Sequence, residues 1–350
     1  MQLEVQREAF DTISNDEITI LDNAGLPSVM VPIKNFKSSE IDKSLPEHTH
    51  PAFIVNGKEA ETVYVSKYIN VVFDGRAYSL PGQAPRTHIS FDEAVEVCRK
   101  KGEGWGLMPA SLWAAIALWC KKNNTVPKGN TKFGRSFDDP LSKGEATDTG
   151  LKRIYMTKTG SGPAEWNHDH TEHGISDLVG NVFEWQAGLR SVKANISVIP
   201  NADCIDHNVS LASDSASWRF ITEDGTFTEN ADKGLKLDFN DEKAAFVYKS
   251  ANKLDSAMNT ARYCEFRNLM SDINVPDILK ELILFPKDGA DTYKRDLFYM
   301  ANLLPEGIAF RGGYFDGDFM SGIFNTGFNM IRTDKTPYIG FRSVYYEFKD

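Results

Sequence analysis

The chain has 350 residues, of which 41% are hydrophobic and 25% are charged, and its formal net charge is -10. This composition belongs to a globular protein with enough residues for one large core or two smaller ones. The acidic balance argues against non-specific nucleic-acid binding. The longest apolar run, residues 112–120, is too short to cross a bilayer and fits a buried helix. We therefore expect neither nucleic acid as a partner nor insertion into a membrane.

Residues 1–45 alternate short apolar runs with turn signals, and residues 18–21 and 29–33 read as strands. They predict a small β-rich N-terminal arm for attachment or oligomer contact. The alternative is an extra edge layer on the main domain. Residues 1–8 lack the apolar stretch of a secretory signal. We therefore expect synthesis in a cytosol, so that any exterior role needs another exit such as virion release.

The next region carries strand and helix signals. Residues 63–68 alternate with period two, and residues 70–73 lead into a turn at 74–75. Ser90 and Glu93 have the spacing of a capping box at the start of a helix. Residues 111–122 are apolar nearly all round, which predicts a buried core helix.

The middle of the chain is harder to read. Residues 123–173 are rich in Gly, Asp, Thr and Pro and predict loops. Within 190–305 we expect strands at 196–199 and 245–248, and helices at 278–284 and 293–303.

The four cysteines are widely spaced and form no Cys-x-x-Cys pair, which argues against a zinc site or a disulfide framework. Cys98 and Cys120 lie on apolar helical patterns, so we expect them to be buried thiols.

The last forty residues have an unusual composition. The triplets Arg-Gly-Gly (311–313) and Gly-Phe-Arg (340–342) enclose a segment rich in Tyr, Phe, Asp, Ser, Asn, Thr and Gly. Aromatic rings give large contact area at low entropy cost, and short polar side chains give adaptable hydrogen bonds. The segment has no His and no Cys, and its only close carboxylates are Asp316 and Asp318. It therefore suits binding better than catalysis.

Four blocks stand in one order along the chain: 61–68 (ETVYVSKY); 89–115, which contains ISFDEA, LMP and WAA; 174–185 (GISDLVGNVFEW); and 311–342 with its two terminal triplets. This order resembles the formylglycine-generating enzyme (sulfatase-modifying factor) family, a variant of the C-type lectin fold. The resemblance implies an α+β domain over 46–350, interrupted by a long insertion at about 190–305.

The residues of the third block, 174–185, favour a structural role. Asn181 can lock a tight loop and Trp185 can anchor the core through a partnered indole N–H. The resemblance leaves a calcium site near Asn181 as the alternative; otherwise we expect no cofactor.

The chain departs from the family at the catalytic positions. The family's oxidase activity needs a pair of cysteines in the C-terminal segment, and residues 311–342 contain none. A related branch uses histidine-bound iron, so His48 with His50, and His168 with His170 and His173, are the metal candidates to examine. We expect them to be solvated or structural histidines, and the protein not to be an enzyme.

The C-terminal segment also resembles the variable region of diversity-generating retroelement proteins, which bind ligands on the same lectin-type fold. Such regions begin with Arg-Gly-Gly, carry Gly-(Val/Ile)-Phe in the middle and end in Ile-Gly-Phe-Arg; here these are 311–313, 322–324 and 339–342. The resemblance implies a fixed scaffold of Arg311, Gly312, Gly313, Gly340, Phe341 and Arg342, to which Asn181 and Trp185 of the third block are added as structural residues. Core positions are expected at Phe324 and Phe341.

The ligand-binding set implied by this resemblance is Tyr314, Phe315, Asp316, Asp318, Phe319, Met320, Phe328, Asn329, Met330, Asp334, Thr336 and Tyr338. The side chains expected to point outward are those of Tyr314, Asp316, Asp318, Met320, Asn329, Met330, Asp334, Thr336 and Tyr338, together with the Gly327 position.

These observations predict a non-enzymatic, retroelement-diversified receptor-binding protein of a phage tail tip. The expected receptor is a host-surface protein or glycan. Residues 1–45 would contact other virion proteins, and a homo-oligomer such as a trimer would add avidity. The alternatives are a metal-dependent oxidase of the same fold, a fixed virion decoration protein, and, for location, a bacterial cell surface or the cytoplasm.

Overall fold

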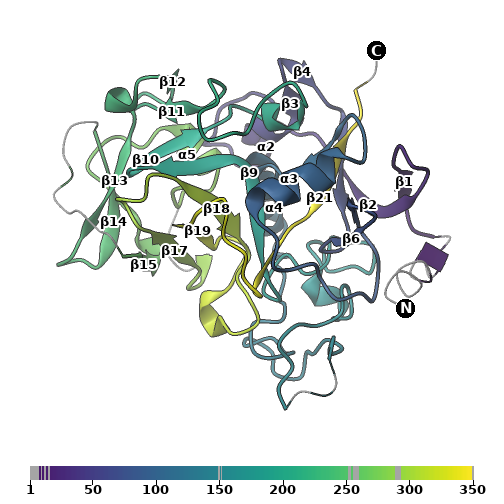
Figure 1. Cartoon of the computed structure of the whole chain (residues 1–350). Coiled ribbons are helices and arrows are strands. Elements are labelled where there is room, and N and C mark those ends of the chain that lie inside the picture. The colour runs from purple at the N-terminus through teal and green to yellow at the C-terminus, as the bar shows by residue number, and fades with distance from the viewer. Residues whose placement is uncertain are drawn as a thin grey trace.

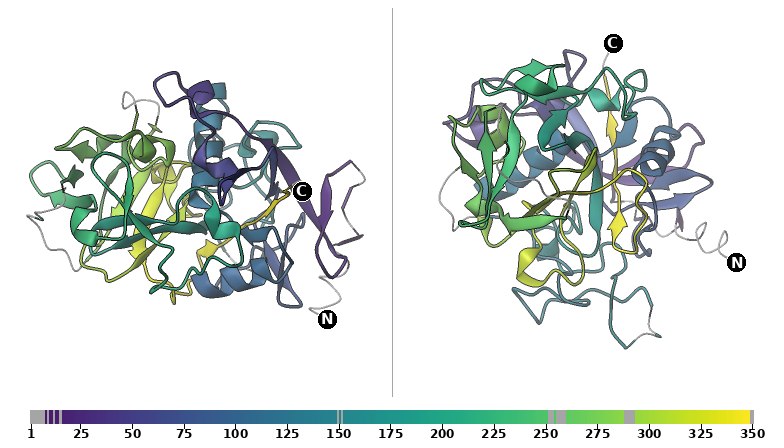
Figure 2. Two further views of the ribbon diagram at one scale, coloured as in Figure 1. Left: turned by 90° about the horizontal axis from the view of Figure 1, so that it is seen from above. Right: turned by 60° about the vertical axis from the view of Figure 1, so that its left-hand side comes forward.

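The computed structural model describes residues 8, 10, 11, 13, 14, 16–148, 150, 152–250, 254, 260–287 and 293–348. The architecture is α+β, with most regular residues in strands and few in helices. Figure 1 shows green and yellow strands on one side of the molecule and purple strands on the other. The left view of Figure 2 separates the same two groups. No described helix has the length and apolar character needed to cross a membrane.

The smaller sheet joins the two ends of the described chain. Its five strands follow the order β1-β2-β5-β21-β8, and all of its pairs are antiparallel. Their bounds are β1 (Thr19–Leu21), β2 (Pro27–Lys34), β5 (Thr62–Ser66), β8 (Trp105–Leu107) and β21 (Ser343–Tyr346). Val29, Met30 and Val31 of β2 are buried. Residues 19–34 therefore pair within this sheet, and a role of residues 1–45 in attachment or oligomer contact stays a prediction. Residues 1–7, 9, 12 and 15 lie outside the described residues.

The larger sheet has twelve strands and is built around β9. Strand β9 pairs with β18 and β10 in antiparallel fashion and with β20 in parallel fashion. The bounds are β9 (Phe183–Val192), β10 (Asn195–Val198), β11 (Arg219–Ile221), β12 (Phe227–Thr228), β13 (Lys236–Asn240), β14 (Ala245–Lys249), β15 (Arg262–Glu265), β16 (Met270–Ser271), β17 (Leu297–Met300), β18 (Gly307–Arg311), β19 (Thr326–Met330) and β20 (Ile339–Gly340).

Short hairpins and helices complete the fold. The hairpin strands are β3 (Ile54–Val55), β4 (Lys58–Glu59), β6 (Val71–Phe73) and β7 (Arg76–Tyr78). The helices are α2 (Ser38–Ile41), α3 (Phe91–Arg99), α4 (Ala110–Asn123) and α5 (Asp277–Glu281), with 3-10 turns at Pro51–Phe53, Ala164–Trp166, Asp203–Ile205, Ala231–Lys233, Phe266–Asn268 and Asp318–Met320. The predicted turn between β6 and β7 has positive φ at Asp74 (47°) and Gly75 (68°), which matches the twist of a tight hairpin.

Two helix predictions from local signals are confirmed. The hydroxyl of Ser90 accepts a hydrogen bond from the Glu93 amide, and the Glu93 carboxylate accepts one from the Ser90 amide at 2.9 Å. This reciprocal cap starts α3. Helix α4 is buried along nearly its whole length, and Asn124, with φ of 56°, ends it in the left-handed conformation.

The main core unites both sheets around α4. One continuous cluster contains Trp113 of α4, Val63 of β5, Ile196 of β10 and Phe328 of β19. The four cysteines are all free and buried, which confirms the prediction for Cys98 and Cys120.

The described part of residues 190–305 contains the end of β9 and eight further strands of the large sheet, β10 to β17. The strands predicted at 196–199 and 245–248 are confirmed as β10 and β14, and α5 begins the predicted helix at 278–284. The helix predicted at 293–303 is wrong, because Leu297–Met300 within it forms strand β17. The backbone of β17 pairs with two neighbouring strands, β15 and β19. These pairings outweigh the helical spacing of apolar residues in its sequence.

Candidate ligand-binding surface

The C-terminal segment leaves the large sheet through a turn that only glycine can form. At the end of β18, Gly312 and Gly313 have φ of +94° and +84°. A Cβ at Gly313 would lie 2.3 Å from the Cβ of Ser321, so a side chain there would also collide. The carbonyl of Gly312 accepts a hydrogen bond from the Gly180 amide at 2.9 Å. This turn therefore fixes the start of the segment against the 174–185 block.

Asn181 connects three loops. Its Oδ1 accepts hydrogen bonds from the Thr157 amide at 2.9 Å and from Nδ2 of Asn130 at 3.2 Å, and its Nδ2 donates to the Thr157 carbonyl at 3.1 Å. Its carbonyl accepts from the Phe315 amide at 3.2 Å. The side-chain oxygen considered for calcium is thus already hydrogen-bonded within the chain.

The tip of the segment is held by its main chain. The carbonyl of Phe315 accepts from the Phe133 amide at 2.7 Å, and the Asp318 amide donates to the Thr131 carbonyl at 2.8 Å. These bonds involve no side chain of the segment. Substitution of those side chains therefore leaves this set of hydrogen bonds available.

The end of the segment is fixed by a buried ion pair. Arg342 is fully buried and forms two hydrogen bonds with the carboxylate of Glu184, at 2.8 and 3.0 Å. It also donates to backbone carbonyls of Ser66, Lys67 and Ser176 at 2.8 to 2.9 Å. Both partners of this pair are therefore desolvated and mutually satisfied.

Other predicted scaffold positions lie in the core. The indole N–H of Trp185 donates to the Ile89 carbonyl at 3.0 Å, and Phe341 is fully buried. Gly340 pairs with Glu184 in β9. Arg311 is also fully buried, but none of the described carboxylates pairs with it, and burial lowers the pKa of its guanidinium to about 9. Its Nη2 donates to the Leu282 carbonyl at 2.8 Å, while Nε and Nη1 have no hydrogen-bond partner among the described residues.

A half-buried aromatic cluster lies where the two ends of the segment meet. The ring of Tyr314 stacks on Phe183 with centroids 5.2 Å apart and an interplanar angle of 27°. Tyr338 lies 5.6 Å from Tyr314 and 6.5 Å from Phe183. Burial raises the pKa of Tyr314. Its hydroxyl therefore stays protonated at neutral pH and can donate a hydrogen bond.

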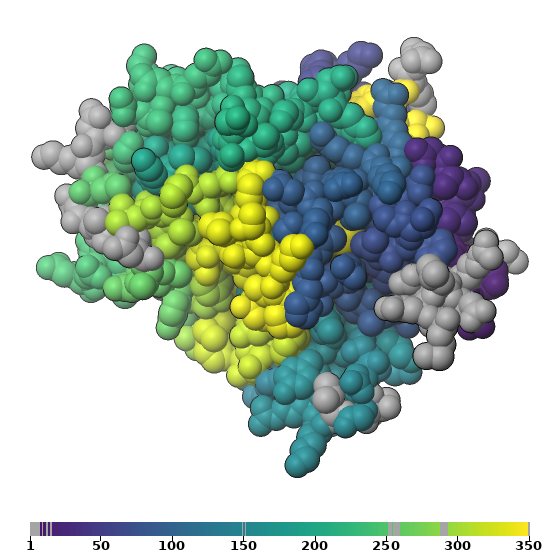
Figure 3. Space-filling model, in the orientation of Figure 1, coloured from purple at the N-terminus to yellow at the C-terminus, as the bar shows by residue number. Residues whose placement is uncertain are grey.

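Aromatic residues outside the segment extend this surface. Phe319 packs edge-on against Phe137 at 5.5 Å, and the Arg295 guanidinium lies 4.1 Å from the Phe319 ring centroid. Phe137 is 36% and Tyr155 is 43% exposed. The sequence analysis missed these residues because they lie in a region classified only as loops; bulky aromatics among Gly and Asp were the available signal. Figure 3 shows the yellow C-terminal segment on one face, with a teal lobe below it.

Nine predicted ligand-binding residues keep exposed or half-buried side chains: Tyr314, Asp316, Asp318, Phe319, Met320, Asn329, Asp334, Thr336 and Tyr338. The remaining three, Phe315, Phe328 and Met330, are buried.

The outward orientation predicted for Gly327 and Met330 is wrong. Both belong to β19, which pairs on one side with β18 and on the other with β17. A Cβ at Gly327 would lie 2.0 Å from the Phe310 ring. Phe328 packs in the same strand against Phe298, with centroids 5.7 Å apart. Gly327, Phe328 and Met330 are buried in this interior strand and cannot contact a ligand, whereas Asn329 of the same strand remains half-buried.

His168, His170 and His173 contact different parts of the protein. His168 is buried, and its Nδ1 accepts from the Ile175 amide at 2.9 Å. His170 lies with Nε2 3.3 Å from the Val126 carbonyl, and His173 is exposed. Among the described residues, no group of three or more His, Cys, Asp or Glu side chains is arranged to hold a metal ion.

The first histidine pair contacts one residue of α5. Nε2 of His48 lies 2.7 Å from Oε1 of Glu281. Nε2 of buried His50 lies 3.1 Å from the Glu281 carbonyl.

No protein-family model and no curated protein matches this sequence. Solved structures give low similarity. PvdO from Pseudomonas aeruginosa matches with a TM-score of 0.39 and 10% identity over 96% of this chain and 100% of that chain. Treponema denticola variable protein 1 matches with a TM-score of 0.34 and 11% identity over 95% of this chain and 100% of that chain.

The Major Tropism Determinant U1 variant matches with a TM-score of 0.31 and 12% identity, covering 83% of this chain and 51% of that chain. This chain thus spans about half the length of that protein. All three TM-scores are below 0.5.

Proposed function

We propose that this chain is a non-enzymatic ligand-binding protein on a C-type lectin type of scaffold, with a binding surface in residues 311–342 that a retroelement diversifies. In this proposal the protein belongs to a phage tail tip, and the ligand is a protein or glycan of the host surface. The order of the sequence motifs supports the proposal. The Arg-Gly-Gly and Gly-Phe-Arg triplets also both meet β9: Arg311 of β18 and Gly340 of β20 pair with the same residue, Glu184.

The observation that carries the proposal is the main-chain anchoring of the segment. Amides and carbonyls of Gly312, Phe315 and Asp318 bond to backbone groups outside the segment. The exposed side chains between them make none of these bonds, so they can change while the loop keeps its shape. A fixed backbone with replaceable side chains is what a diversified binding surface requires.

Two polar groups of the surface support a ligand role. Oδ1 of Asn329 and Oγ1 of Thr336 are shielded from solvent and have no hydrogen-bond partner among the described residues. A buried polar atom without a partner costs free energy, which a ligand that supplies a donor would recover. The half-buried rings of Tyr314 and Tyr338 would supply the apolar contact.

Sequencing the 3′ end of the gene across a propagated population tests the proposal. We expect amino-acid changes at positions 314, 316, 318, 320, 329, 334, 336 and 338, matched to adenines in a nearby near-copy of the segment. We expect none at Gly327 or Phe328. A population without variation, and without a near-copy in the flanking DNA, would contradict diversification.

Stability measurements on purified variants test the division between surface and scaffold. Phe328→Ala is expected to reduce the free energy of unfolding by about 3–5 kcal/mol, because it empties a fully buried site. Tyr314→Ala removes a half-buried ring and should cost at most about 2 kcal/mol. Urea denaturation of both variants gives the comparison. Equal losses would show that Tyr314 is a core residue like Phe328.

A further inference from the structure

A second cavity lies away from the proposed binding surface. It has a volume of about 800 Å³, and its described lining residues include none from 311–342. The walls come from residues 46–59, the start of α4, β9 and β10, the β11–β12 turn, and residues 274–282. This volume is in the range of sites that bind small ligands, so it has room for one long side chain together with part of its main chain.

The charges around the cavity are unbalanced. Five carboxylates line it: Glu59, Glu223, Asp224, Asp277 and Glu281. Lys280 is the only Lys or Arg among the described lining residues, and its Nζ lies 2.8 Å from Asp277 in an ion pair. A concave site with an excess of one charge concentrates its field and favours a ligand of the opposite sign.

Glu281 provides a specific hydrogen-bond acceptor in this negatively charged cavity. Its side chain is only 2% exposed, and its Oε1 lies 2.7 Å from Nε2 of His48. No hydrogen bond to the other oxygen, Oε2, is present among the described residues, and Oε2 does not belong to the fully shielded polar atoms that lack a partner. It therefore remains accessible from the cavity, where a cationic donor would form a charge-assisted hydrogen bond with it.

The position of Glu281 is fixed in advance. His50 is buried, and its Nδ1 accepts a hydrogen bond from the Ala52 amide at 3.2 Å, so Nε2 carries the proton and donates to the Glu281 carbonyl. Burial lowers the pKa of His50 to about 4, which keeps this ring neutral at neutral pH. Two contacts from residues 48–50 therefore hold α5 at its C-terminal end. An acceptor held in place before binding loses little entropy when a ligand arrives.

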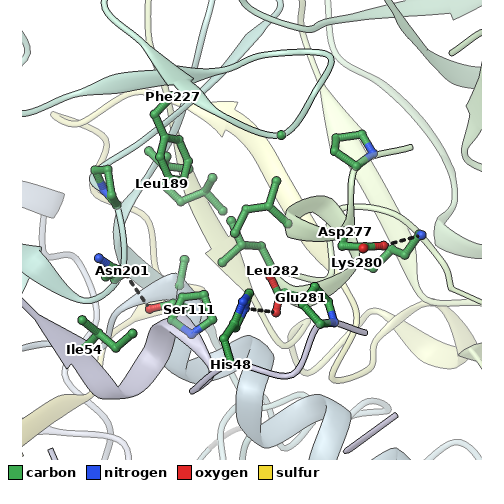
Figure 4. Close-up of a pocket in the computed structure, with 18 of the residues that line it drawn as sticks. His48, Ile54, Ser111, Leu189, Asn201, Phe227, Asp277, Lys280, Glu281 and Leu282 are labelled. Carbon is green, nitrogen blue, oxygen red and sulfur yellow. Dashed lines mark hydrogen bonds and ion pairs between the residues drawn. The ribbon is translucent and has the colours of Figure 1, made fainter. Parts of the chain in front are cut away.

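The opposite end of the cavity carries large apolar side chains. Figure 4 shows Phe227 and Leu189 at one end and His48, Ser111 and Glu281 at the other. The Phe227 side chain is 40% exposed, and Leu282 also lines the site. Such a wall suits methylene groups, and an aromatic face attracts a cation.

We propose that this cavity binds the side chain of an arginine from a peptide or protein partner, with its guanidinium on Glu281 and its aliphatic stem against Leu189 and Leu282. The guanidinium is more weakly hydrated than an ammonium, so it loses less solvation on entering the cavity, and one of its N–H groups can donate to Oε2 of Glu281. The site shares no lining residue with the proposed variable surface, so either proposal can fail without the other.

Calorimetric titration with N-acetyl-arginine amide tests the proposal. The matched probe is N-acetyl-citrulline amide, which has the same shape without the charge. We expect the arginine derivative to bind at least about ten-fold more tightly, since charge-assisted hydrogen bonds exceed neutral ones by about 1.4 kcal/mol or more. Agmatine, which carries a guanidinium without a peptide group, separates a peptide side chain from a free amine: tighter binding of agmatine would overturn the peptide assignment.

Two variants and two controls complete the test. Glu281→Gln should weaken binding of N-acetyl-arginine amide by about ten-fold or more. Phe227→Ala, which removes apolar surface beside Leu189, should weaken it by about three-fold or more. Phe227 lies on the short exposed strand β12, so its variant is informative even if Glu281→Gln lowers the melting temperature. Glu103→Gln, an exposed carboxylate outside the cavity, and Tyr314→Ala on the proposed binding surface should leave binding unchanged. Equal affinity for arginine and citrulline derivatives, no binding of either, or full affinity in both cavity variants would overturn the proposal.

Discussion

Replacing Arg342 with methionine is expected to reduce the free energy of unfolding by about 3–5 kcal/mol. The substitution removes two hydrogen bonds to the buried carboxylate of Glu184 and leaves that charge in the core without a partner. It also leaves the carbonyls of Ser66, Lys67 and Ser176 without the donors that Arg342 now supplies. Urea denaturation followed by circular dichroism gives the free energy directly.

Arg311→Met is the matched control, because Arg311 is equally buried but none of the described carboxylates pairs with it. Its removal forfeits one hydrogen bond to the Leu282 carbonyl and relieves an unpaired buried charge. We expect a change within about 1 kcal/mol, in either direction. A similar loss in both variants would mean that volume, rather than the Glu184 pair, determines the effect.

Replacing Asp296 with asparagine is expected to raise the free energy of unfolding at pH 8 by up to about 4 kcal/mol. Asp296 is buried, and its Oδ2 accepts a hydrogen bond from the Phe324 amide at 2.8 Å. Burial raises its pKa to about 7, an effect that the Phe324 hydrogen bond and Lys294 oppose and Asp138 reinforces. The carboxyl is therefore preferred in its neutral form when the protein is folded.

The pH dependence of the stability difference follows from this raised pKa of Asp296. The contribution of Asp296 to stability is fully present below its unfolded pKa, about 3.9, and is lost as pH rises through the folded value of about 7. Asparagine keeps an acceptor and cannot ionise, so the difference between the two proteins should shrink toward zero at pH 4. Denaturation between pH 4 and 8 measures it. Asp272→Asn, at an exposed position, should stay within about 0.5 kcal/mol throughout. A pH-independent difference, or a less stable asparagine variant at pH 8, would contradict the assignment.

The features that the sequence analysis located correctly depend on local signals. The capping box at Ser90, the apolar helix α4 and the alternating strand β5 each show their pattern within a few residues. The terminal triplets of the C-terminal segment are also local, and their glycines and arginines lie where backbone constraint and burial are strongest.

The sequence predictions that the structure contradicts failed for one shared reason. A strand gains its partners from distant parts of the chain, so β17 could be recognised only once β15 and β19 were known to flank it. The same pairing buries Phe328 and Met330, which by composition alone resemble binding residues. Strands β11, β12, β13, β15, β16 and β17, from the described part of residues 190–305, likewise belong to the large sheet although little in their sequence indicates it.

The sequence by itself determined the capped start of α3, the glycine turn at 312–313 and the aromatic and polar character of the C-terminal segment, because these follow from short-range sterics and hydrogen bonding. Only the tertiary structure decided which of those aromatics reach the surface, that Phe137 and Tyr155 border them, and that Glu281 faces a separate acidic cavity. Burial and charge pairing arise from residues brought together across the whole chain, and a reading of neighbours along the sequence does not contain that information.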